Sequence, residues 1–211
     1  IYGADMRGSL FDPAEKHWNV DNLGSILNCL DVEVTGVTSA YLYFGMWRAM
    51  FAWHTEDMDL YSVNYVHYGA PKHWYAIPVA HREKFERMAQ DFFPDLASEC
   101  DQFLRHKTTL ISPAVLHQND IAVYTTVQQA GEFVVTFPGV YHAGFNHGFN
   151  CAEAVNFATE TWIEYGMRAL VCNCVRDSVR INMSDFLHSY LRHALVVRPR
   201  ALCKLKPLSP S

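Results

Sequence analysis

The chain has 211 residues, 50% of them hydrophobic and 14% aromatic, which is enough apolar material for one domain with a substantial core. Its net charge of −5 and isoelectric point near 6.1 argue against direct binding to nucleic acid, and they suit a basic partner such as a Lys/Arg-rich peptide. No run approaches the roughly 18 apolar residues of a transmembrane helix, so no membrane span is expected. The 6 cysteines in a chain of this size favour a reduced, intracellular protein over a disulfide framework.

Capping and turn residues predict the elements of the first half of the chain. A helix is expected to begin at Asp12–Pro13, where an acidic N-cap precedes a proline at the first helical position, and another to span Leu23–Leu30. Over Tyr41–Ile77, aromatic and β-branched runs separated by glycines predict strands joined by turns. The apolar spacing in Ala80–Phe93 predicts an amphipathic helix, which Pro94 ends.

The second half is predicted to hold mostly strands, followed by two helices and a tail. A loop extends to about residue 107, and the strand-like runs after it are Thr109–Ile111, Ile121–Val127, Glu132–Phe137, Tyr141–Phe145 and Ala152–Phe157. Helices are predicted over Thr161–Val171 and Ser184–Leu195, before a frayed or extended tail at Val196–Ser211. Many short strands without alternating helices favour a mainly β sandwich or jelly roll over a parallel sheet.

Two histidines and one glutamate carry the clearest chemical signal. Residues i and i+2 of a strand point to the same side, so His54 and Glu56 can reach one metal ion. In a jelly roll, His142 on a facing strand can complete the set. Two histidines with one carboxylate are typical of non-haem iron(II) sites, which keep positions open for substrate and dioxygen.

The His-x-Glu spacing alone is weak, because 11 histidines and 22 acidic residues in 211 positions produce about one such triplet by chance. The chain contains a second triplet, His81 to Glu83, but it falls in the predicted amphipathic helix, where residues two apart diverge by about 200°. His147 is a competing ligand candidate. A regular strand would place it on the face opposite His142, so we expect a structural role for it.

A lysine and a set of cysteines add two further hypotheses. Lys72 lies among aromatic residues, where a buried ammonium group needs an anionic partner such as a ligand carboxylate; a solvent-facing lysine after the turn at Gly69–Pro71 is the alternative. Zinc prefers the tetrahedral sulfur and nitrogen shell that three cysteines and one histidine provide, and buried free thiols are the alternative. The candidate zinc set is Cys100, His106, Cys172 and Cys174.

Four segments carry a family resemblance: Ile1–Asp5, Tyr41–Trp47, Phe51–Tyr61 and His142–Glu153. They closely resemble the JmjC-domain histone lysine demethylases, and most closely the subfamily that acts on trimethylated lysines of the histone H3 tail. The resemblance implies a double-stranded β-helix, which is a cupin-like jelly roll, with flanking helices and a structural zinc site. It also implies a JmjC catalytic domain over residues 1–174, followed by a helical segment and tail over residues 175–211.

The implied activity is oxidative demethylation of a methylated lysine in the histone H3 tail, with dioxygen consumed and formaldehyde and succinate released. The implied cofactors are Fe(II), the cosubstrate 2-oxoglutarate and structural zinc, and the implied location is the nucleus. By the same resemblance, the iron ligands are His54, Glu56 and His142, and the zinc ligands are the four residues of the candidate set.

The resemblance also assigns residues to the cosubstrate and the substrate. The positions that would hold 2-oxoglutarate are Tyr2, Asn64 and Lys72, with Phe51 and Trp74 beside them. The positions that would line the methyl-ammonium pocket are Gly36, Tyr43 and Asn156, and those near the peptide or the mouth of the site are Asp5, Tyr41 and Lys107.

Departures from the family pattern leave alternatives open. Ala154 and Val155 stand where some relatives carry hydroxyl side chains in the methyl pocket, so the choice of lysine and methylation state stays open. The companion JmjN segment of the family is not found in the sequence, and the start at Ile1 rather than Met suggests part of a longer protein. The rival functions are a JmjC-class protein hydroxylase and a catalytically silent, zinc-stabilised chromatin-binding module. A jelly roll with incidental histidines is the simplest alternative.

Overall fold

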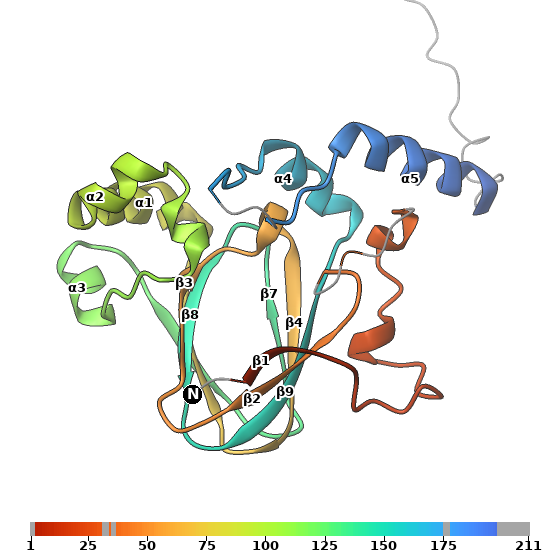
Figure 1. Cartoon of the computed structure of the whole chain (residues 1–211), viewed down its shortest axis with the longest axis horizontal. Helices are drawn as coiled ribbons and strands as arrows, with labels where there is room; N and C mark the ends of the chain where they lie inside the picture. The colour runs from red at the N-terminus through yellow and green to blue at the C-terminus, as the bar shows by residue number, and fades with distance from the viewer. Residues whose placement is uncertain (1–2, 31–33, 35–36, 175–177, 198–211) are drawn as a thin grey trace, which may run out of the picture.

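The computed structural model describes residues 3–30, 34, 37–174 and 178–197 (Figure 1). Two residues assigned to the predicted site, Tyr2 and Gly36, lie outside the described residues. Most of the predicted tail does as well, although its first two residues belong to the last helix. The proposed boundary between residues 174 and 175 falls beside an undescribed segment and stays a prediction.

Two antiparallel sheets form the body of the protein. One is a 5-stranded sheet with the order β1-β2-β9-β4-β7, and the other is a 4-stranded sheet with the order β3-β8-β5-β6. The strands are β1 Gly3–Arg7, β2 Tyr41–Gly45, β3 Met50–His54, β4 Tyr61–Gly69, β5 Lys72–Ile77, β6 Tyr124–Gln128, β7 Phe133–Thr136, β8 Tyr141–Asn146 and β9 Asn150–Phe157.

The chain path through these sheets is that of a jelly roll. From β2 onward the chain passes from one sheet to the other at every step except between β5 and β6, so strands distant in sequence become neighbours. Alternating side chains therefore point into the space between the two sheets, where a site can be built from several strands. The predicted mainly β jelly roll with flanking helices is confirmed.

Short helices surround the two sheets. Helices α1, α2 and α3 lie beside β3 and β8, whereas α4 and α5 lie over one end of the barrel (Figure 1). No described helix is both long and apolar enough to cross a membrane. The helices are η1 Val20–Asn22, η2 Ile26–Cys29, η3 Asp57–Asp59, η4 Val79–His81, α1 Arg82–Phe92, α2 Pro94–Glu99, η5 Phe103–His106, α3 Pro113–Gln118, η6 Glu160–Trp162, α4 Ile163–Arg168 and α5 Met183–Val197.

Several predicted elements are wrong for identifiable reasons. The Asp12 carboxylate accepts a hydrogen bond from Ala14 N at 2.8 Å, which forms an Asx-type turn instead of starting a helix. Of the predicted helix over Leu23–Leu30 only the short 3-10 helix η2 forms, and η1 ends at Asn22, before the predicted start. Thr109–Ile111 is not a strand. The predicted amphipathic helix, α1, does end before Pro94, but Pro94 is also the first residue of α2, where its missing N–H costs nothing.

The hydrophobic core divides into clusters that fix the helices to the sheets. Trp53 on β3 and Phe85 on α1 belong to the cluster that joins α1, α2 and α3 to the outer side of the 4-stranded sheet. A second cluster contains Leu60, Trp162 and Phe186, and it joins η6 and α5 to the segment before β4. The 4-stranded sheet is therefore supported by α1, α2 and α3, and the segment before β4 is supported by η6 and α5.

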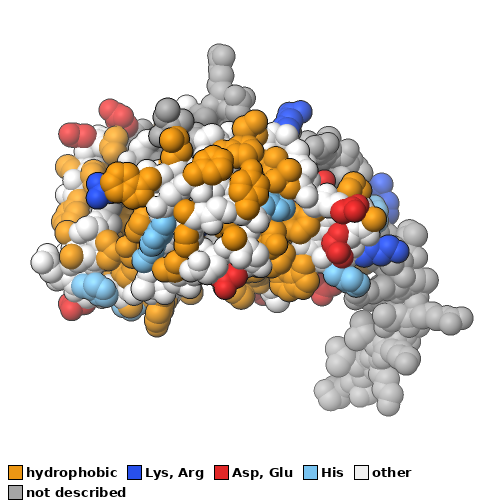
Figure 2. All heavy atoms as spheres, turned by 90° about the horizontal axis from the view of Figure 1, so that it is seen from below, with side chains coloured by type: hydrophobic (Ala, Val, Ile, Leu, Met, Phe, Trp, Pro, Cys, Tyr) orange, Lys and Arg blue, Asp and Glu red, His pale blue; other side chains and the backbone are white. Residues whose placement is uncertain are grey.

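Turns that lead from one sheet to the other meet at the other end of the barrel. His147 N donates to Pro71 O at 2.9 Å and Arg48 N donates to Asn146 O at 2.9 Å, so three turns lie against one another there. Figure 2 shows the molecule from this side, with hydrophobic side chains and several histidines exposed on the surface. Among these turns, the side chain of Trp47 is 67% exposed.

Replacing Phe85 by Ala is expected to lower the free energy of unfolding by about 3–5 kcal/mol, because the ring is 0% exposed and its removal leaves a cavity between α1 and β3. Urea denaturation measures this change. The matched control is Phe92→Ala on the same helix, whose ring is 47% exposed and should matter little. Equal losses from the two variants would contradict the assignment of the core.

Candidate functional site

Three side chains with metal-binding atoms converge between the sheets. His54 is the last residue of β3 and pairs in register with His142 on the neighbouring strand β8. The strand ends before Glu56, but Glu56 keeps extended backbone angles (φ −65°, ψ 155°), so its carboxylate points to the same side as His54. One ligand atom from each residue lies within 4.8 Å of the others. His142 therefore comes from the adjacent strand of the same sheet, and not from a strand that faces β3.

Each histidine is oriented by the carbonyl two residues before it. His54 Nδ1 lies 2.7 Å from Ala52 O, and His142 Nδ1 lies 3.1 Å from Val140 O. Since a carbonyl oxygen only accepts, the Nδ1 atoms are the donors in these two contacts, and Nε2 is then the atom of each ring that a metal ion can bind. Without a metal, His142 Nε2 lies 3.3 Å from Glu56 Oε1. Metal-binding histidines are commonly oriented in this way, by a carbonyl that accepts from the other ring nitrogen.

The electrostatics of the triad also suit a divalent cation. Burial, with a further contribution from His142, lowers the pKa of His54 to about 3. Burial alone would raise the pKa of Glu56, but the hydrogen bond from His142 and the nearby positive charges outweigh it and hold the pKa well below the usual range. At neutral pH the site thus offers a neutral imidazole and an ionised carboxylate, which are the protonation states that metal binding requires.

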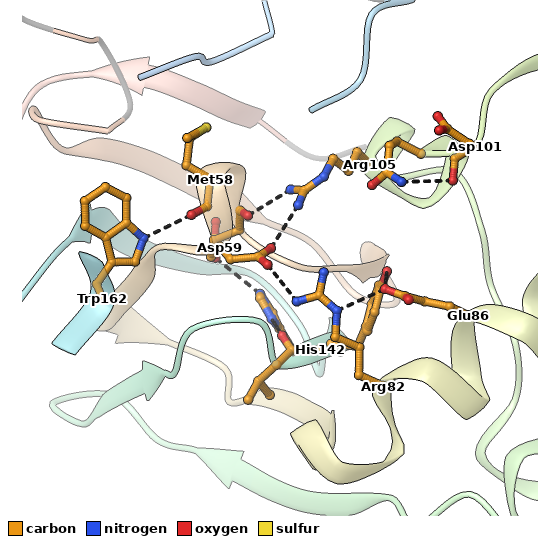
Figure 3. A network of polar contacts seen from close by, with 12 residues as sticks. Met58, Asp59, Arg82, Glu86, Asp101, Arg105, His142 and Trp162 are labelled. Atoms are coloured by element: carbon orange, nitrogen blue, oxygen red, sulfur yellow. Dashed lines mark hydrogen bonds and ion pairs between the residues drawn. The ribbon is translucent and has the colours of Figure 1, made fainter. Parts of the chain in front are cut away.

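The loop that carries Glu56 is strained. Met58 and Asp59 adopt left-handed angles (φ 53° and φ 50°), and a methionine side chain rarely occupies this region, which costs free energy unless the surroundings impose it. Trp162 Nε1 donates to Met58 O at 3.0 Å, which fixes the loop from the side of η6 (Figure 3).

Two arginines hold the same loop through Asp59. Arg82 Nη1 and Arg105 Nη2 lie 2.6 Å and 2.9 Å from the two oxygens of the buried Asp59 carboxylate (Figure 3). Arg105 Nη1 also donates to the backbone oxygen of Glu56 at 3.0 Å, and Arg82 Nε donates to Glu86. The backbone position of Glu56 therefore depends on a buried ion network that the sequence did not reveal.

A cavity of about 360 Å³ lies beside the triad. Lys72 lines it and is only 1% exposed, so the solvent-facing alternative for this lysine is wrong. The Asn64 side-chain oxygen is buried there without a hydrogen-bond partner among the described residues, as expected where a ligand completes the site. The other predicted residues on its lining are Phe51, Trp74, Tyr43, Asn156, Asp5 and Lys107.

Not every predicted residue reaches the cavity. Tyr41 is half-buried on β2, opposite Ala154, but it does not line the cavity. Ser62 lines the cavity and was not predicted, since an isolated serine in a strand gives no sequence signal. His147 lies outside the triad as expected, with its ring stacked against His73 and Phe145.

The four residues of the candidate zinc set also come together. Their sulfur and nitrogen atoms lie within 4.8 Å of one another, although Cys100 and Cys172 are separated by 72 residues in the chain. The Cys100 and Cys172 sulfurs are 3.6 Å apart, and His106 Nε2 is 3.1 Å from Cys172 Sγ. Tetrahedral zinc with bonds of about 2.3 Å would separate two sulfurs by about 3.8 Å, whereas a disulfide separates them by about 2.05 Å. The distance between the two sulfurs therefore fits ligands of one metal ion and does not fit a disulfide.

Comparison with known proteins identifies relatives over most of the chain. Residues 41–157 match the family described as JmjC domain, hydroxylase. The sequence is 56% identical to lysine-specific demethylase 4B of Mus musculus, 54% identical to probable lysine-specific demethylase 4F of Homo sapiens and 55% identical to lysine-specific demethylase 4D of Rattus norvegicus. Each match covers 89% of this chain, but only 18%, 30% and 38% of the respective relatives. The resemblance inferred from the sequence motifs is confirmed.

Replacing Asp59 by Asn is expected to destabilise the protein by about 3 kcal/mol, because two arginines would lose the carboxylate that neutralises them inside the loop. Thermal and urea unfolding measure the loss. Glu164→Gln, which removes one partner of an exposed ion pair with Arg168, serves as the control and should have little effect. An Asp59→Asn protein as stable as the unmodified one would show that the network does not hold the loop.

If the candidate set binds zinc, replacing Cys100 by Ser is expected to lower the zinc content of the purified protein and its unfolding temperature together, since one of the four candidate ligands is lost. Elemental analysis and calorimetry provide the two readouts. Cys29→Ser is the control, because Cys29 lies outside the cluster. Unchanged zinc content in the Cys100→Ser variant would leave buried thiols as the better description.

Proposed function

The chain belongs to the JmjC family, and we propose on this premise that it removes methyl groups from lysine in the histone H3 tail by an Fe(II)- and 2-oxoglutarate-dependent oxidation. The single observation that carries the proposal is the convergence of His54, Glu56 and His142 beside a cavity that contains a buried lysine. In the net reaction, methylated lysine, 2-oxoglutarate and dioxygen give lysine with one methyl group fewer, formaldehyde, succinate and carbon dioxide.

The triad is proposed to hold Fe(II). Two imidazoles and one carboxylate are a donor set suited to this ion, and they leave coordination positions for the oxo acid and for dioxygen. Bound iron would supply the activation of dioxygen. The protein itself keeps the Glu56 carboxylate ionised and holds it in place through Arg105 and Asp59.

Lys72, Asn64 and Tyr2 are proposed to bind 2-oxoglutarate. A buried ammonium needs a negative charge nearby, and the distal carboxylate of the oxo acid supplies one. The aromatic rings of Phe51 and Trp74 line the same cavity and would exclude water from that ion pair. The proposed role of Tyr2 derives from the family resemblance alone.

Tyr43, Asn156 and the Gly36 carbonyl are proposed to surround the methyl-ammonium group, with Glu56 nearby. A quaternary ammonium cannot donate an ordinary hydrogen bond, so weak C–H···O contacts to these oxygens would position it. Asp5 and Lys107 line the cavity and would lie near the bound peptide; Tyr41 would contact the peptide outside the cavity.

The partner and the location follow from the substrate. A methylated, basic H3 tail suits an acidic chain with a net charge of −5, and a nuclear location is proposed because histones are its proposed substrate. Zinc in the cysteine–histidine cluster is proposed to be structural, because all four ligands would come from the protein and no position would remain open.

Incubating the full chain with Fe(II), ascorbate, 2-oxoglutarate and a panel of methylated H3 peptides is expected to release formaldehyde and to remove the mass of one methylene group per turnover. His142→Ala should abolish this release, because it removes one of the three ligands. His117→Ala, an exposed substitution on α3, is the control and should leave turnover unchanged.

Other outcomes of this assay would favour the rival functions. A peptide that gains oxygen without formaldehyde release would indicate a protein hydroxylase. Peptide binding without peptide-dependent succinate would indicate a silent chromatin-binding module. Turnover that persists in the His142→Ala variant would contradict the proposed iron site.

A further inference from the structure

We propose that Asn146 is a positioning residue for Lys72, and that it sets where the distal carboxylate of the cosubstrate binds. The inference rests on the proposed function, in which Lys72 meets that carboxylate. It concerns two asparagines to which the proposed function assigns no role: Asn146 at the end of β8 and Asn150 at the start of β9.

Lys72 and Asn146 face each other across neighbouring strands. Lys72 on β5 pairs in register with Asn146 on β8, and its Nζ atom donates to Asn146 Oδ1 at 2.7 Å. An ammonium group only donates, so the amide oxygen must be the atom that faces it. The amide is neutral. It therefore fixes the direction of the lysine without cancelling the positive charge that an anionic ligand needs.

The Asn146 amide is itself held on both sides. Its Nδ2 donates to Ala49 O at 3.3 Å, and its Oδ1 also accepts from Asn150 Nδ2 at 3.0 Å. Asn150 Nδ2 in turn donates to Ala70 O at 2.9 Å. Both asparagines are 0% exposed, so water does not compete for these bonds. Reversing the Asn146 amide would break its contacts with Ala49, Asn150 and Lys72 together.

Gly45 provides the space for the two amides. Asn146 lies at the end of β8 in one sheet, whereas Asn150 begins β9 in the other and pairs with Gly45 on β2. A Cβ atom at Gly45 would collide with the side chains of both asparagines. The two amides thus join the sheets where β8 turns into β9, and the Lys72 ammonium is positioned from both sheets at once.

A fixed ammonium has a consequence for ligand choice. The triad and the Lys72 nitrogen together define how far apart the two ends of an oxo acid must lie. Asn146 would therefore help the site to prefer ligands with a distal carboxylate, and it would not contribute to binding of the oxo-acid end. Its replacement should weaken the binding of ligands that have a distal carboxylate and leave the binding of ligands without one unchanged.

The test measures binding of two oxo acids to the Mn(II)-loaded full chain by calorimetry, directly for 2-oxoglutarate and by competition for 2-oxobutanoate, which lacks the distal carboxylate. Asn146→Asp keeps the side-chain shape but places a carboxylate against Lys72 Nζ. We expect it to weaken 2-oxoglutarate binding by about 10- to 100-fold and to leave 2-oxobutanoate binding nearly unchanged.

A second variant tests the same contact by filling the space at Gly45 that the two amides occupy. Gly45→Ala should displace both amides and reduce the preference for 2-oxoglutarate in the same way, so the test does not depend on the folding of one variant. The matched control is Asn19→Asp, a buried asparagine bonded to the backbone of Asp12 and Glu15, which should bind both acids as the unmodified chain does.

The outcomes separate this inference from the proposed function. If the unmodified chain does not bind 2-oxoglutarate, the proposed function fails. If it binds, and the Asn146→Asp variant either keeps full affinity or loses both acids equally, Asn146 has at most a structural role and the inference is overturned. Selective loss of 2-oxoglutarate supports it.

Discussion

The register between β3 and β8 is the constraint on which the candidate site depends. It places His54 directly opposite His142, although 87 positions of sequence lie between these residues. Side chains alternate along a strand, so a shift of one residue would turn one histidine away from the other. The irregularity between Phe51 and His54 is part of this arrangement, because the pairing resumes at His54 only after a break in the ladder. The packing of α1, α2 and α3 against these strands supports that register from outside.

The third member of the triad is fixed by a different means. Glu56 follows the end of β3, so no ladder hydrogen bond determines its position. Instead, a strained loop is held by Asp59 between two arginines, and this arrangement tolerates the left-handed backbone at Met58 and Asp59. The sheet fixes the positions of the two histidines, and the buried ion network fixes the position of the Glu56 carboxylate. The site thus combines rigid strand geometry with a loop held under strain.

The sequence predicted the parts that follow from local periodicity and from composition. Alternating strands implied the jelly roll, and the His54 to Glu56 spacing implied a shared side even though Glu56 lies beyond the strand. Thr109–Ile111 shows the limit of propensity: its β-branched residues run beside β3 without forming a ladder, because only isolated bonds such as Trp53 N to Thr109 O connect them. The contacts of Asp59 with Arg82 and Arg105 span 23 and 46 residues and leave no local pattern.

Two neighbouring residues of the short helix η5 belong to different groups of contacts. The Arg105 side chain holds the carbonyl of Glu56, and the next side chain, His106, belongs to the cysteine cluster. The single turn of η5 thus contacts both candidate metal centres. Unwinding that turn would release one contact of each centre at the same time.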